Sequence, residues 1–218
     1  METELKNVLP FWYFLSEKDR QLVVKSLEQL LFQKGAKVYH VKKEDAGLKI
    51  LISGRIRVFL STSDGNEITL YRIENKNLNI WSVFSMMSDG QIDINMEAEE
   101  DSVVYWVPET ICKKLSDECS AVSEFIWQVG MKHLQAVISV VQNLAFTKSS
   151  KRLADSLIAH SRWNQSEVLF ITHEELANDI GTAREVVSRL LKKFEKLGFV
   201  SLSRGKIDIL DFDGLKKI

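Results

Sequence analysis

Four polar side chains between residues 184 and 189 have the chemistry needed to recognise base pairs. They are Arg184, Glu185, Ser188 and Arg189. An arginine can donate two hydrogen bonds to guanine O6 and N7, and a glutamate can accept one from cytosine N4. Their spacing places all four on one side of a helix. We therefore expect a helix whose outward face contacts base edges in a groove of DNA.

Two short-range capping signals indicate how this helix is positioned. Thr172 with Glu175 and Thr182 with Glu185 both match the T-x-x-E capping box, which predicts a helix starting at each threonine. Gly181 separates the two helices, and a helix, a glycine turn and a second helix are typical of a helix-turn-helix. Glu185 then has two candidate roles, in the Thr182 cap or on a base. The apolar residues expected on the inner face of the second helix are Val186, Val187, Leu190, Leu191 and Phe194.

Basic residues concentrate around this second helix, although the chain as a whole is slightly acidic. The formal net charge is −1 for the chain, but +3 from residue 148 onward and −4 before it. Residues 182–206 alone carry +5, which is typical of a surface that binds a polyanion, although a solvated charged face is the alternative. Residues 200–209 predict a hairpin with Arg204 at its tip, placed like a wing that contacts phosphate. The predicted phosphate contacts are Thr172, Thr182, Lys192, Arg204 and Lys206.

The first half of the chain predicts a β domain. Residues 1–31 have a 3.6-residue apolar period after Ser16 and Glu17, which predicts helices. Residues 34–107 instead carry short runs of alternating apolar residues separated by turn signals such as Ser53-Gly54, a pattern typical of a sandwich or barrel. The alternating runs are 48–52, 56–60, 68–70 and 94–98.

Residues 120–147 predict a helix of about 28 residues with two apolar stripes, which imply two neighbours. One stripe contains Phe125, Leu134, Ile138 and Val141, and we expect it to cover the β domain. The other, close to a 3.5-residue period, is suited to pairing with a second copy of the helix. The alternative is that both stripes lie in one monomer core. The predicted dimerisation residues are Ile126, Val129, His133, Ala136 and Val140.

Length and composition restrict the class of protein. A chain of 218 residues with 45% hydrophobic residues is an ordinary globular protein of one or two domains. Its apolar runs are too short to span a bilayer, and the acidic start at Met1–Glu4 does not resemble a signal peptide, so we expect a cytoplasmic protein. Cys112 and Cys119 lie seven residues apart on a predicted helix, too far apart to form a disulfide within the chain.

The sequence resembles the CRP/FNR family of bacterial transcription regulators over nearly its whole length. The resemblance lies in residues 9–35, in LISGRIRV at 51–58 with DGNE at 64–67, and in ITHEELA at 171–177 followed by REVVSRLL at 184–191. It implies an α+β protein that binds a palindromic promoter site as a homodimer, with half-sites about one helical turn (34–36 Å) apart. The implied parts are a double-stranded β-helix sensory domain over 1–119, a dimerisation helix over 120–147 and a winged helix-turn-helix over 148–218.

The resemblance also bears on base recognition and on partners. Arg184, Glu185 and Arg189 match the base-reading positions of the cyclic-AMP-responsive branch, whereas Glu185, Ser188 and Arg189 match those of the oxygen-responsive branch. The partners that it implies are double-stranded DNA, a second copy of the chain, RNA polymerase and a small-molecule effector bound in the β domain.

The sensory region departs from the patterns of known branches. Cyclic-nucleotide members hold the phosphate with an arginine, but between residues 73 and 107 the only basic residue is Lys76. Two separated cysteines cannot supply the four thiolates of an ordinary iron–sulfur cluster, although they could contribute to a site with other ligands. A haem would need an axial ligand such as His40, His133 or one of the cysteines. The cofactor is therefore unknown. An apolar effector pocket is predicted at Trp81, Phe84, Met86 and Trp127, although residues of this kind are often ordinary core.

Two other classes of protein compete with this interpretation. A β domain that acts through protein partners would not need the basic second helix or the wing. A cupin-type metalloenzyme would need clustered ligands, whereas the four histidines lie in different segments, and no phosphate loop or nucleophile elbow is present. We therefore expect neither a catalytic site nor a metal site.

Overall fold

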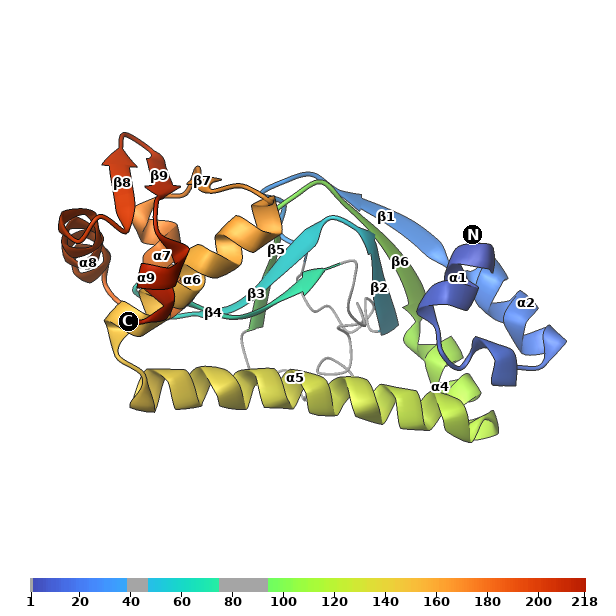
Figure 1. The fold of residues 1–218 in the computed structure, drawn as a ribbon. Coiled ribbons are helices and arrows are strands. Elements are labelled where there is room, and N and C mark those ends of the chain that lie inside the picture. Colours follow the sequence, from blue (N-terminus) through green and yellow to red (C-terminus); the bar gives the residue numbers. More distant parts are fainter. Residues whose placement is uncertain (1, 39–46, 75–93) are drawn as a thin grey trace. The chain divides into compact units, whose positions relative to one another are not determined.

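The computed structural model describes residues 2–38, 47–74 and 94–218 (Figure 1). These residues divide into two compact units. The first contains residues 1–60 and 71–137, and the second contains residues 61–70 and 138–218. The division falls inside the long helix and not at residue 147, so the last turns of that helix belong to the second unit.

The first unit is built on two three-stranded sheets (Figure 1). One has the order β1-β6-β2 and is antiparallel, and the other has the order β4-β3-β5. The predicted alternation therefore does form strands of a β domain. The strands are β1 (Glu28–Phe32), β2 (Gly47–Ser53), β3 (Arg55–Ser61), β4 (Glu67–Glu74), β5 (Ile94–Ala98) and β6 (Ser102–Pro108).

Helices α1 (Glu2–Val8), α2 (Glu17–Ser26) and α4 (Glu109–Glu118) contribute to the core of the first unit, as does the first half of α5 (Ser120–Phe146). Their apolar faces meet alternate residues of β2 and β6, such as Ile50 and Tyr105, and Trp12 is fully buried in the same cluster. The helix start predicted at Ser16 is confirmed, because the Ser16 hydroxyl accepts a hydrogen bond from the Asp19 amide.

The prediction of helix up to residue 31 is wrong at its end, because β1 begins at Glu28. Leu30 faces Val104 of β6 in the register of the sheet. Pairing with this distant strand outweighs the local 3.6-residue period, since residues 28–32 gain a full ladder of backbone hydrogen bonds from it.

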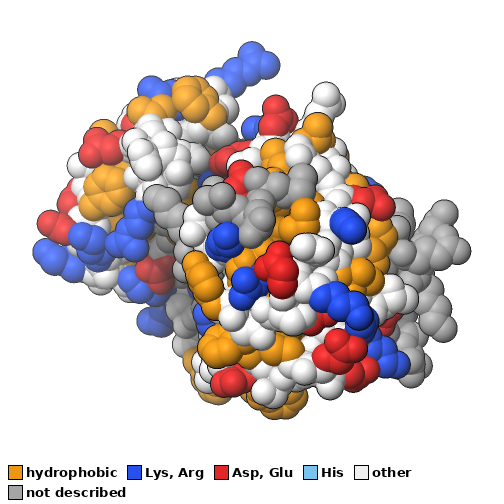
Figure 2. Space-filling view, turned by 90° about the vertical axis from the view of Figure 1, so that its right-hand side faces the viewer, with side chains coloured by type: hydrophobic (Ala, Val, Ile, Leu, Met, Phe, Trp, Pro, Cys, Tyr) orange, Lys and Arg blue, Asp and Glu red, His pale blue; other side chains and the backbone are white. Residues whose placement is uncertain are grey.

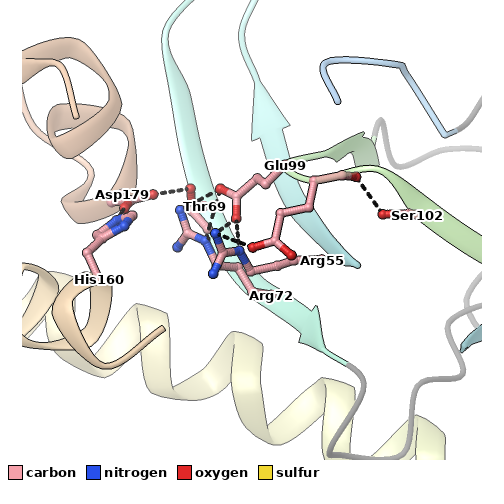
Figure 3. A network of polar contacts seen from close by, with 8 residues as sticks. Arg55, Thr69, Arg72, Glu99, Ser102, His160 and Asp179 are labelled. Carbon is pink, nitrogen blue, oxygen red and sulfur yellow. Dashed lines mark hydrogen bonds and ion pairs between the residues drawn. The ribbon is translucent and has the colours of Figure 1, made fainter. Parts of the chain in front are cut away.

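Two arginines and two glutamates form an ion-pair network on the β4-β3-β5 side of the first unit (Figure 3). Arg72 donates to both carboxylate oxygens of Glu99, at 2.8–3.0 Å, and Arg55 contacts Glu99 at 3.0 Å and Glu100 at 2.9 Å. The two guanidinium groups are largely buried, so their pairing offsets the cost of removing them from water.

The long helix α5 (Ser120–Phe146) confirms the predicted element within one residue. Val122, Phe125, Val129 and His133 are buried along one side of it. The spacing of three to four residues between them is that of a single helix face packed on a core.

The second unit is a bundle of helices around a small sheet of order β7-β9-β8 (Figure 1). Its core contains Leu157, Leu176, Leu191 and Phe194, each at most 1% exposed. The helix-turn-helix and the wing thus fold around one hydrophobic core. The elements are α6 (Ser149–Asn164), β7 (Val168–Leu169), α7 (His173–Ile180), α8 (Arg184–Lys196), β8 (Val200–Ser203), β9 (Lys206–Ile209) and α9 (Phe212–Lys216).

Asp179 of α7 is a buried acceptor in the second unit (Figure 3). One carboxylate oxygen accepts from the Thr69 hydroxyl at 3.0 Å, and the other lies 2.6 Å from His160 Nε2 of α6. The His160 ring in turn meets Trp163 edge to face, with ring centroids 4.9 Å apart. Asp179 therefore links α7 to α6 and to the 61–70 segment through directional contacts.

In the space-filling view, Lys and Arg side chains are interspersed with Asp and Glu over the face that is drawn, with hydrophobic side chains scattered between them (Figure 2). None of the helices among the described residues has both the length and the apolar character needed to cross a membrane. A surface suited to a polyanion must therefore be located from individual side chains.

Replacing Asp179 with Ala should lower the free energy of unfolding by about 1–3 kcal/mol, because it removes the acceptor of Thr69 and the partner of His160 inside the protein. Urea unfolding followed by circular dichroism measures the loss. The matched control is Asp155→Ala, since that carboxylate is 57% exposed and pairs with Lys151 at the surface. A change below about 0.5 kcal/mol is expected for the control. Equal losses for the two variants would contradict the role of Asp179.

Candidate nucleic-acid interface

The first helix of the helix-turn-helix starts at a complete capping box. The Thr172 hydroxyl accepts from the Glu175 amide at 3.1 Å, and the Thr172 amide donates to the Glu175 carboxylate at 2.6 Å. The capping box predicted at Thr172 is thus confirmed. It fixes the start of α7 at His173.

The second predicted cap is wrong. Helix α8 begins at Arg184, and its N-cap residue is Ala183, which offers no side-chain hydrogen bond. Gly181 adopts a left-handed conformation with φ 60°, and the Thr182 amide donates to the Ala177 carbonyl at 3.0 Å. Thr182 is consequently part of the turn and one residue too early to cap α8. Glu185 therefore does not form a capping box with Thr182.

Burial divides α8 into two faces. Val187 and Leu191 are fully buried and Phe194 is 1% exposed. Burying each of these side chains contributes about 1.5–3 kcal/mol, which fixes the rotation of the helix about its axis. Arg184 and Arg189 are exposed as a consequence.

The outward face of α8 brings together the four side chains predicted to read bases. They line a hollow of about 760 Å³ that carries five basic side chains and a single acidic one. Both bidentate donors and a carboxylate acceptor are thus available within one helix face. The residues that line it are Arg184, Glu185, Ser188, Arg189, Lys192, Lys193 and Lys196.

The predicted wing is present as the β8–β9 hairpin and is attached to α8. Glu195 at the end of α8 accepts a hydrogen bond from the Leu202 amide of β8 at 3.0 Å. Arg204 stands exposed at the tip beside Gly205, whose φ of 71° suits a tight turn. Lys206, by contrast, pairs with Asp208 at 2.9 Å, so part of its charge is already compensated.

His173 is a residue of this interface that the sequence analysis did not single out. Its Nδ1 lies 2.8 Å from the hydroxyl oxygen of Ser188, and that hydroxyl donates to the Arg184 carbonyl at 3.0 Å. Burial, with a smaller effect from the Arg184 charge, lowers the pKa of His173. Both effects favour the neutral form of the ring. A pairing between positions 173 and 188 has no signature in a single sequence, because it joins two helices.

The burial of α5 does not follow the two predicted stripes, because Phe125 of one stripe and Val129 of the other are both buried. Val129 is 1% and His133 is 8% exposed, so neither is available to a second copy. The stripe that stays exposed contains Trp127 at 62%, Leu134 at 42%, Ile138 at 47% and Val141 at 59%. Of the remaining predicted dimerisation residues, Ile126, Ala136 and Val140 are half-buried, and Ile126 packs against the core of the first unit.

Most of the predicted effector pocket lies outside the described residues. Trp81, Phe84 and Met86 belong to the 75–93 segment. Trp127 is exposed, since it lies on the side of α5 opposite to the buried Phe125 and Val129. Its place in an effector pocket stays a prediction.

His133 and Cys112 are buried titratable groups of the first unit. The His133 ring stacks on the Tyr71 ring, with ring centroids 4.9 Å apart. Burial lowers the pKa of His133 to about 4 and raises the pKa of Tyr71. Burial also raises the pKa of the Cys112 thiol to about 11. Both cysteines are free. At pH 7, then, His133 is neutral and Cys112 is a protonated thiol.

Comparison with known proteins places this geometry among transcription regulators. Residues 151–218 match the Crp-like helix-turn-helix domain. A structure from Eubacterium rectale, described as a transcriptional regulator of the CRP/FNR family, is 29% identical with a TM-score of 0.89 and covers 97% of this chain and 98% of that one.

Two curated relatives come from Thermus thermophilus. The cyclic AMP receptor protein is 23% identical over 209 residues, or 96% of each chain. The transcriptional regulator SdrP is 32% identical over 85 residues, which cover 36% of this chain and 42% of the relative.

The lowered pKa of His133 predicts a stability that falls in acid. Between about pH 6.5 and pH 4 the unfolded chain binds a proton at this position that the folded chain does not, so the free energy of unfolding decreases as the pH falls. In His133→Leu that decrease should be smaller by about 1–2 kcal/mol between pH 7 and pH 5. Urea unfolding at the two pH values measures it. Lys132→Ala, at an exposed neighbouring position, should keep the wild-type dependence, and an unchanged dependence in His133→Leu would refute the prediction.

Proposed function

The chain belongs to the CRP/FNR family of DNA-binding transcription regulators. On this premise we propose that two copies of the chain bind a palindromic site, with the α8 helices of the two copies in successive major grooves. The observation that carries the proposal is the outward face of α8, where Arg184, Glu185, Ser188 and Arg189 lie together over a buried apolar face. Half-sites about one helical turn apart follow from two-fold symmetry.

The chemistry of this face supports recognition of G·C pairs. Arg184 and Arg189 are exposed and can each donate two hydrogen bonds to guanine O6 and N7. Glu185 can accept from cytosine N4, since the cap of α8 does not use its carboxylate. Each well-made pairing discriminates against a wrong base by about 1–3 kcal/mol. We expect at least one G·C pair in each half-site.

Phosphate contacts around this face would position α8 without reading sequence. Lys192 and Arg204 are exposed on α8 and at the wing tip, and Thr172 is exposed at the start of α7. Thr182, in the turn, lies between the two helices. Lys206 is the weakest member of the predicted set, because Asp208 already pairs with it.

Dimerisation is assigned to the exposed stripe of α5 in place of the buried one. Trp127, Leu134, Ile138 and Val141 follow one another at intervals of seven, four and three residues, which is the a/d spacing of a coiled coil. Packing this stripe against its copy would remove four large side chains from water in each chain.

The regulatory ligand is proposed to be a small molecule other than a cyclic nucleotide. The name of one Thermus relative identifies it as a receptor for cyclic AMP. In this chain, however, the stretch from residue 73 to residue 107 has Lys76 as its only basic residue and no arginine to hold a cyclic phosphate. RNA polymerase is the expected further partner, since a transcription regulator acts on the enzyme that starts transcription.

Selection of bound sequences from random duplexes tests recognition by α8. The wild type should enrich a palindrome, and Arg189→Ala should lose about 1–3 kcal/mol of discrimination at one base pair of each half-site. Arg204→Ala, at the wing tip, is the matched control and should weaken binding to all duplexes about equally. A uniform loss for Arg189→Ala would show that Arg189 contacts only phosphate, and an absence of any enriched site would contradict the proposed function.

Replacing Ile138 with Glu should convert the dimer into a monomer, because it places a charge in the centre of the exposed stripe. Light scattering during size-exclusion chromatography measures the mass in solution. Lys132→Glu also changes the charge of an exposed α5 residue, but outside the stripe, and should remain dimeric. If Ile138→Glu has the mass of the wild type, the stripe is not the interface.

A further inference from the structure

The contact between His173 and Ser188 determines how Ser188 can hydrogen-bond to a base. Ser188 is half-buried on the outward face of α8, and its hydroxyl oxygen lies 2.8 Å from His173 Nδ1. The same hydroxyl donates to the Arg184 carbonyl at 3.0 Å. Both contacts engage the one polar atom that Ser188 would present to DNA.

A count of protons defines the role of each atom. A serine hydroxyl has one proton, and here it goes to the Arg184 carbonyl. The short contact with His173 then requires that Nδ1 carry a proton and donate it to the serine oxygen. Ser188 is left with an unused lone pair and without a proton to give, so toward DNA it is an acceptor only.

The position of His173 is itself fixed. It is the first residue of α7, directly after the capping box formed by Thr172 and Glu175. The residue is half-buried, and its ring contacts Ser188 of α8. The capping box fixes the backbone position from which the imidazole reaches Ser188.

We propose that His173 is a positioning residue for base recognition, because it holds the Ser188 oxygen as a hydrogen-bond acceptor. An acceptor at this place selects a base that carries an amino group, adenine or cytosine, on the contacted strand. In the major groove adenine offers N6–H and cytosine offers N4–H, whereas guanine and thymine offer acceptors at the equivalent positions. The inference rests on the proposed function, since it requires that α8 lie in the major groove.

Removing His173 should relax this selection. Without the Nδ1 donor, the Ser188 hydroxyl is free to rotate and to turn its proton toward guanine O6 or thymine O4. The preference for an amino-bearing base at that position should then fall by about fivefold, the value of one hydrogen bond. The other positions of the site, read by Arg184, Glu185 and Arg189, should keep their preferences.

The test is selection from random duplexes with full-length wild type, His173→Ala, His173→Leu and His173→Asn. Leucine fills the space of the imidazole without offering a nitrogen, so His173→Leu and His173→Ala should both relax the preference at the same base pair. The two variants differ in packing, so either one tests the inference if the other folds poorly. Asparagine can place an amide N–H near the position of Nδ1 and should restore the wild-type preference. In a Ser188→Ala background, His173→Ala should cause no further change, because the atom through which it acts is absent.

The outcomes separate this inference from the proposed function. Loss of preference at a single position, rescued by asparagine, supports it. An unchanged preference in His173→Ala and His173→Leu, or equal weakening toward all duplexes as for a phosphate contact, overturns it while the wild type still selects a palindrome. A wild type that enriches no site overturns the proposed function and this inference together.

Discussion

Burial of one side of α8 is the constraint on which the DNA-binding surface depends. Val187, Leu191 and Phe194 lie in the core of the second unit and are at most 1% exposed. The helix cannot rotate about its axis without bringing these side chains into water, so Arg184 and Arg189 must face outward. The wing follows from the same packing, since Glu195 at the end of α8 holds the β8 backbone. Burial of apolar side chains thereby orients the polar groups proposed to recognise DNA.

Features set by short-range chemistry could be predicted from the sequence. The capping box at Thr172 and the length of α5 depend on residues within a few positions of one another, and the structure agrees with both. Gly181 likewise marks the turn, because its φ of 60° suits glycine. The outward face of α8 was predictable for a related reason: the apolar spacing of a helix defines its inner side, and the remaining side chains must face out.

Features that depend on a distant neighbour could not be predicted. Periodicity predicts two apolar stripes on α5, but only packing in the folded chain shows that Val129 lies in the core of the first unit and that His133 is buried against Tyr71. The cap expected at Thr182 failed because its amide bonds back to Ala177 within the turn. The local period predicts helix at residues 28–31, where the structure has strand β1, because the partner strand β6 lies far along the chain. The contact of His173 with Ser188 belongs to the same class, because it joins two helices.

Methylation interference on the selected duplex tests the central claim most directly, because a methyl group on guanine N7 blocks the major-groove edge that an arginine of α8 would contact. The account predicts interference at guanines in two segments about 34–36 Å apart on one side of the duplex, related by the two-fold axis. Interference confined to the minor groove, or equal binding of methylated and unmethylated duplex, would contradict it.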